Sequence, residues 1–139
     1  MPTRFLRITC LQDEPIDIGT KDSGRGMFAF NVLTHKVASA TYEKELVRVI
    51  QTAALGTWGT DLFDSSSAVI PDGDGPYVSV RSTGGAAGLQ VQEEARPKYH
   101  RATAQIVVQA RISEVAKARA VAVHDALATV VNQDITPVS

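Results

Sequence analysis

The stretch RATAQIVVQARI (residues 101–112) and the SEVAKARAVAVHDALATVV that follows it (residues 113–131) decide the predicted fold. In the first part, apolar residues alternate with polar ones, which predicts a strand over residues 102–112 with one buried face. Its inward residues would be Ala104, Ile106, Val108, Ala110 and Ile112. The second part, with Ser113 as N-cap, predicts a helix that lies close to a sheet through a narrow stripe of small and medium side chains, namely Ala116, Ala120, Val123, Leu127 and Val130.

Further elements are predicted before this strand, among them a short apolar run at residues 68–70 that is read as a strand. Residues 41–54 form an amphipathic helix, with Thr41 as its N-cap and Gly56 just past its end. Trp58 and Phe63 follow this helix directly and are predicted to be core residues. After a turn at residues 72–76, the alternating residues 77–82 predict a further strand.

A connection of 17 residues, from Gly84 to His100, separates the strands predicted at residues 77–82 and 102–112. Loops of this length are uncommon in small domains unless they are functional or disordered. If the flanking strands pair as antiparallel neighbours, the connection projects as an arm. Its charges are segregated, with Glu93 and Glu94 before the basic run of residues 96–101. It is either an arm that binds a neighbouring subunit or an ordinary surface excursion.

Composition indicates one globular domain, and the order of the predicted helices and strands indicates the α+β class. We predict a small mixed or antiparallel sheet with two main helices packed on one face and a long hairpin loop. Residues 1–40 are read as an N-terminal extension, and residues 41–139 as the domain. The net charge of −1, from 14 Lys and Arg against 15 Asp and Glu, gives no overall attraction to nucleic acid or to an anionic membrane. Cys10 is the single cysteine, which favours a reducing cytoplasm as the site of synthesis.

No motif for catalysis, cofactor binding or metal binding is present. His124 and Asp125 are adjacent on the predicted helix, so their side chains should diverge and fail to pair. The three histidines lack ligand spacing, and residues 72–75 form a turn rather than a calcium loop. The glycines at residues 84–88 precede no helix that could bind phosphate. We therefore predict that the chain is not an enzyme and has no cofactor.

Four sequence segments, taken together, resemble those of a known protein family. They are AALGTWGTDLF (residues 53–63), IPDGDGPYVSVR (70–81), TGG (83–85) and RATAQIVVQAR (101–111), followed by a helix. Their layout over residues 41–135 resembles the small tail-terminator and minor capsid (neck) proteins of long-tailed bacteriophages. Such proteins are structural components of the virion, made in the bacterial host cytoplasm. They form a ring, typically of six copies, that ends the tail tube and faces the head-side connector.

This resemblance implies that the partners are further copies of the chain, the tail tube protein and the connector or neck proteins. DNA would pass through the ring without being read. The residues expected at a subunit interface or at the lumen are Arg81, Gly84, Gly85, Arg96, Lys98, Tyr99 and Arg101. The alternatives are another neck or head-completion protein, a nucleic-acid-binding module that uses the basic run of residues 96–101, and a small enzyme with an unrecognised site.

Overall fold

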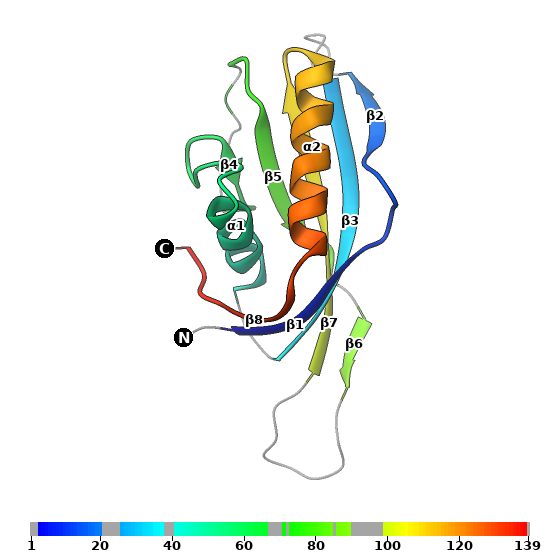
Figure 1. Cartoon of the computed structure of the whole chain (residues 1–139), viewed down its shortest axis with the longest axis vertical. Helices are drawn as coiled ribbons and strands as arrows, with labels where there is room; N and C mark the ends of the chain where they lie inside the picture. The colour runs from blue at the N-terminus through cyan, green and yellow to red at the C-terminus, as the bar shows by residue number, and fades with distance from the viewer. Residues whose placement is uncertain are drawn as a thin grey trace.

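Two long strands, β3 (Gly26–Val37) and β7 (Tyr99–Ala110), form the centre of the fold (Figure 1). They pair antiparallel along their whole length, from Gly26 opposite Ala110 to Val37 opposite Tyr99. The computed structural model describes residues 3–20, 26–37, 41–66, 71, 73–84, 86–89 and 99–138. Every other described strand is bonded to this central pair directly or through one neighbour.

The sheet is of mixed type and follows the order β4-β5-β7-β3-β1-β8, with β2 paired to β3 and β6 paired to β7. Among the strand pairs that the structure describes, only the short β4–β5 pair is parallel. In chain order, the elements around the central pair are β1 (Thr3–Cys10), β2 (Ile16–Thr20), α1 (Tyr42–Thr52), β4 (Leu62–Phe63), β5 (Tyr77–Ser82), β6 (Ala86–Leu89), α2 (Ser113–Ala128) and β8 (Val131–Ile135). The chain is thus α+β with a mixed sheet, as predicted in this broad form.

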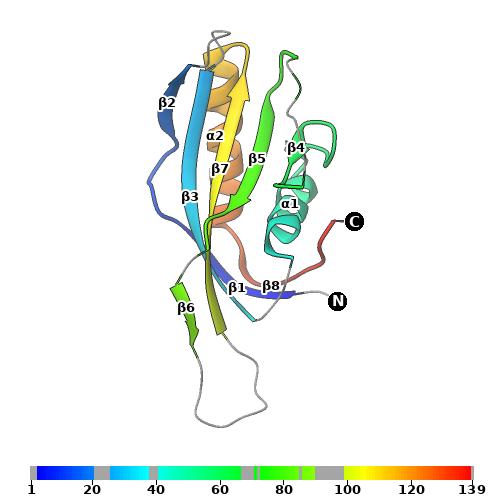
Figure 2. The same ribbon diagram turned by 180° about the vertical axis from the view of Figure 1, so that it is seen from behind.

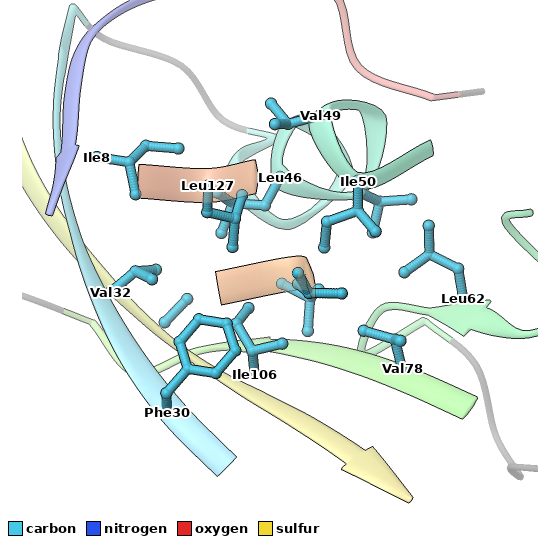
Figure 3. Close-up of a cluster of buried hydrophobic side chains, with 14 of the residues drawn as sticks. Ile8, Phe30, Val32, Leu46, Val49, Ile50, Leu62, Val78, Ile106 and Leu127 are labelled. Carbon is cyan, nitrogen blue, oxygen red and sulfur yellow. The ribbon is translucent and has the colours of Figure 1, made fainter. Parts of the chain in front are cut away.

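The core lies where α2 packs against β3, β7 and β1, and where α1 packs against β5 and α2. Figure 3 shows side chains from these elements pointing towards one another, among them Phe30, Ile106 and Leu127. The predicted stripe of α2 is confirmed, because each of its members is at most 2% exposed: Ala116, Ala120, Val123, Leu127 and Val130. The alanines let the helix approach the sheet closely, while the larger side chains supply most of the apolar area buried.

The predicted strands and helices on either side of the long connection are confirmed, with small differences at their ends. Ser113 is the first residue of α2 rather than its cap, and neither Thr41 nor Ile112 makes a side-chain capping bond. Ile112 was predicted to face inward, but it is 60% exposed, because β7 ends at Ala110 and the chain turns before α2. Trp58 packs against the core, whereas Phe63 is buried outside the main apolar cluster.

Residues 1–40 are not an extension of a domain that begins at residue 41. They supply β1, β2 and β3, and β3 lies in the middle of the sheet with Phe28, Phe30 and Val32 in the core. The prediction failed because residues 27–33 are apolar on both faces of the strand, so the alternation that marks a half-buried strand is weak. β2 and β8 were not predicted. The short strand predicted at residues 68–70 lies outside the described residues.

A buried polar cluster joins α1 to the end of β3. Lys36 and Glu45 are 3% and 0% exposed, and Lys36 Nζ lies 4.0 Å from Glu45 Oε1. Lys36 Nζ also lies 4.9 Å from the centre of the Tyr42 ring. Burial lowers the pKa of Lys36, and the nearby Glu45 carboxylate opposes that shift. The Thr34 hydroxyl lies 2.7 Å from the Tyr42 hydroxyl, which donates to the carbonyl oxygen of Ala102 at 3.3 Å.

The cluster predicts the effect of Tyr42→Phe on stability. The substitution leaves the Thr34 hydroxyl and the Ala102 carbonyl without this partner in the core, so the free energy of unfolding should fall by about 1–3 kcal/mol. Urea denaturation measures the change. The double variant Tyr42→Phe with Thr34→Val should lose less than the sum of the two single variants, because both polar partners are then removed. A single variant as stable as the wild type would contradict the role given to this cluster.

Candidate assembly surface

The face of the sheet opposite α2 is built from alternate residues of β5, β7 and β3, and we call it the outer face. Directly paired residues lie on the same side of a sheet, so the register fixes its members. Most are only partly buried, in contrast to the inward residues. The members central to the surface are Ser79 and Arg81 of β5, Thr103, Gln105 and Val107 of β7, and Met27, Asn31, Leu33 and His35 of β3.

Two predicted interface residues, Arg81 and Arg101, lie on this outer face. Arg81 is exposed on β5 and pairs with Gln105 of β7. Arg101 lies four residues before Gln105, on the same face of β7, and is partly buried. Four residues of strand separate their positions by about 13 Å. The structure therefore brings these two residues to one surface without placing them in contact.

The other predicted interface residues are only partly described. Gly84 follows β5 with φ of +97°, a conformation that favours glycine, and an added Cβ would meet nothing within 4 Å. Tyr99 begins β7, with Val37 of β3 and Leu89 of β6 as its neighbours in the pairing. Gly85, Arg96 and Lys98 lie outside the described residues.

The predicted 17-residue connection contains a strand, β6, which pairs antiparallel with the start of β7. β5 and β7 are antiparallel neighbours, which was the condition for the connection to project as an arm. Figures 1 and 2 show β6 and the first part of β7 extending past both helices. We call β6 and residues 99–103 the β-arm. The sequence of β6, AAGL, has low strand propensity, which explains why the prediction missed it.

Sequence reasoning also missed two basic residues of the outer face. Arg7 of β1 pairs with His35 of β3, which in turn pairs with Arg101 of β7. The three side chains therefore form one row across the sheet. Arg7 is exposed, and no described carboxylate lies within ion-pair distance of it. The alternation of residues 6–10 was the available signal, but the partner strand β3 had not been recognised.

A cavity of about 260 Å³ opens on the outer face near the β4–β5 edge. Phe63, Met27 and Val107 contribute apolar surface to it, and Arg81 contributes a cation. Asp64, which also lines the cavity, is 6% exposed. Its carboxylate accepts hydrogen bonds from Ser66 Oγ at 2.6 Å and from Trp58 Nε1 at 3.5 Å. The residues that line the cavity are Met27, Phe63, Asp64, Ser65, Ser79, Val80, Arg81, Gln105, Val107 and Gln109.

The prediction that His124 and Asp125 do not pair is wrong. His124 Nδ1 lies 3.2 Å from Asp125 Oδ1, because the exposed carboxylate folds back onto the ring. His124 Nε2 lies 2.8 Å from the carbonyl oxygen of Gln12, so both ring nitrogens have partners. Cys10 Sγ contacts the backbone carbonyl of His124 at 3.5 Å, not its ring. These contacts join β1 to α2.

The Cys10 thiol lacks the environment of a nucleophile. Burial, with a smaller contribution from Asp125, raises the pKa of Cys10 from 9.0 to about 11. A reactive cysteine needs the opposite shift, which would favour the thiolate at neutral pH. The cluster of Cys10, His124 and Asp125 therefore connects elements of the fold.

The raised pKa of Cys10 predicts a loss of stability at alkaline pH. Between pH 9.0 and about 11 the folded state holds a proton that the unfolded state releases, so the free energy of unfolding falls as pH rises. Urea denaturation across this range, on the wild type and on Cys10→Ala, isolates the contribution of the thiol. The variant should lose less stability over the same interval. Parallel curves for the two proteins would exclude the predicted coupling.

Within the described ranges, no group of three His, Cys, Asp or Glu residues is placed to hold a metal ion. None of the helices that the structure describes is long and apolar enough to span a membrane. Comparisons with models of protein families, with curated proteins and with solved structures find no match for this chain.

Proposed function

We propose that the chain is a structural assembly protein, a tail terminator of a long-tailed bacteriophage. Copies of it close into a ring, typically of six, which caps the tail tube and joins it to the head connector. The family resemblance of residues 41–135 supports this proposal. In the proposed subunit, both helices pack on one face of the sheet and leave the outer face for contacts between virion proteins.

The observation that carries the proposal is the β-arm. β6 pairs with β7, and no second strand among the described residues pairs with it. Its other edge therefore presents backbone groups that a further strand can pair with. The arm extends past both helices, where a neighbouring molecule can reach it (Figure 2). A subunit that binds copies of itself needs such an element outside its own core.

The charge distribution suits contacts between proteins around a passage for DNA. Arg81 and Arg101 serve at the subunit interface or at the lumen, together with Gly84, Gly85, Arg96, Lys98 and Tyr99. Cations at the lumen would meet the phosphates of passing DNA, and phosphate contacts carry no sequence information. The chain acts within the virion and needs no catalytic group for this role.

Native mass spectrometry of the purified chain tests the oligomer. We expect one dominant closed species, a small multiple of the subunit mass, that persists on dilution into the low micromolar range. A chain that stays monomeric at high concentration, with no ring in assembled particles, would overturn the proposal. A monomer that binds DNA with a steep salt dependence, lost when Arg101 and the basic residues 96 and 98 are neutralised, would support the nucleic-acid-binding alternative.

Deletion of residues 86–95 tests the β-arm. The core residues labelled in Figure 3 come from β1, β3, α1, β4, β5, β7 and α2, so the variant should fold with a far-UV circular dichroism spectrum close to that of the wild type. Ring formation should fall at least tenfold. If the variant is unfolded, the deleted segment is needed for folding. If the variant folds and assembles normally, the β-arm is not part of the subunit interface.

A further inference from the structure

We propose that the ring closes through a head-to-tail contact between two different edges of the sheet. The projecting edge is the segment of residues 11–19, which we call the acidic edge. It docks on the cavity at the β4–β5 edge of the next copy. This inference rests on the proposed ring-forming function and names the surfaces that form the contact.

The acidic edge has the composition of a contact surface. Leu11, Ile16 and Ile18 are 52%, 51% and 49% exposed, although large aliphatic side chains are usually buried. β2 pairs with β3 on one side, and no other described strand pairs with it. A partner that covers this edge would bury the aliphatic side chains and satisfy the open strand.

The same segment carries exposed negative charge. Asp13, Glu14 and Asp17 are exposed, and no described cation lies within ion-pair distance of them. Asp17 Oδ1 accepts a hydrogen bond from the backbone N–H of Gly19 at 2.8 Å, which holds the bend of β2. The edge therefore offers aliphatic side chains flanked by carboxylates.

The cavity at the β4–β5 edge is complementary to this surface. It combines the apolar surface of Phe63, Met27 and Val107 with the exposed cation of Arg81. The Asp64 carboxylate in the same lining is buried and accepts hydrogen bonds from its own neighbours, whereas Arg81 is exposed to an approaching group. No described carboxylate lies within ion-pair distance of Arg81. An aliphatic side chain can enter the cavity while a carboxylate approaches Arg81.

The register of the sheet places the two surfaces at the same height along the strands. One row across the outer face runs from Phe63 through Ser79, Val107 and Ala29 to Ile16. Phe63, at one end of this row, lines the cavity, and Ile16 at the other end belongs to the acidic edge. A copy set beside the next without a shift along the strands therefore brings Ile16 to the cavity.

The next row places the charges in the same way. Arg81 pairs with Gln105, which pairs with Asn31, whose carbonyl accepts from the N–H of Leu11 at 2.9 Å. Asp13 and Glu14 follow Leu11 and precede Ile16, so they lie between the two rows at the edge. Contact between different surfaces generates a ring if rotation closes it and a helical filament if there is a shift. The shared height meets one condition for closure, namely the absence of a shift along the strands between neighbouring copies.

Substitution of the aliphatic residues tests the contact. Ile16→Asp combined with Ile18→Asp should leave the monomer folded, because both side chains are exposed, and should lower the ring fraction at least tenfold in native mass spectrometry. Ile112→Asp is the matched control, since Ile112 is 60% exposed and lies outside both surfaces. Rings formed equally by the double variant and the control would overturn the inference.

Charge exchange tests the orientation. Arg81→Glu alone, and Asp13→Lys with Glu14→Lys, should each reduce ring formation at least tenfold. A chain with all three substitutions should recover it, and so should an equimolar mixture of the two defective proteins, in which unlike copies alternate. Lys117→Glu, at an exposed position of α2, is the control and should assemble normally.

The outcomes separate this inference from the proposed function. A wild-type chain that never forms a ring overturns both. Wild-type rings that survive every substitution leave the ring-forming function standing and overturn the contact proposed here. Loss without recovery in the combined chain or in the mixture also overturns it, because the substituted charges then do not face each other.

Discussion

The antiparallel pairing of β3 with β7 is the constraint on which the rest of the structure depends. It fixes which residues of both strands face α2 and which face outward, and a shift of one residue would exchange the two sets. The inward set, with Phe30, Val32 and Ile106, builds the core with both helices. The outward set, with Arg101 and Gln105, forms the surface from which function is argued.

The sequence predicted the elements whose patterns are unambiguous. The stripe of α2 combines regular spacing with small side chains, and every second residue of β7 from Ala104 to Ala110 is apolar. These apolar residues are buried as predicted, whereas Gln109, from the set predicted to face outward, is also buried. β3 was missed because Phe28, Ala29 and Phe30 are apolar in succession, a pattern that suits a central strand covered on both sides at that end. β8 has a polar sequence, VNQDI, and owes its place to backbone pairing with β1.

The candidate surface could be predicted only in part, for a related reason. Arg81 and Arg101 lie on strands that were recognised, so their common face followed once the two strands paired. Arg7 and His35 belong to the same surface because β1 and β3 pair with each other. The local sequence pattern of β3 does not show that this strand lies in the middle of the sheet. The cavity beside Arg81 is built from β3, β4, β5 and β7, and such a combination of distant segments depends on the register.

The net charge is close to zero, but the fold separates negative and positive side chains across the sheet. The exposed carboxylates Asp13, Glu14 and Asp17, which form no ion pair with a described cation, gather at one edge of the sheet, while Arg81 lies across the sheet from them. A chain with opposite charges on opposite edges can bind copies of itself in a single direction. This arrangement gives a physical reason for a directional assembly without a large net charge.

Electron microscopy of the purified protein tests most directly whether this chain closes into a ring. We expect uniform end-on views with a central opening and one rotational symmetry, without filaments. Images that show only isolated subunits, or open filaments with a rise between neighbours, would contradict it.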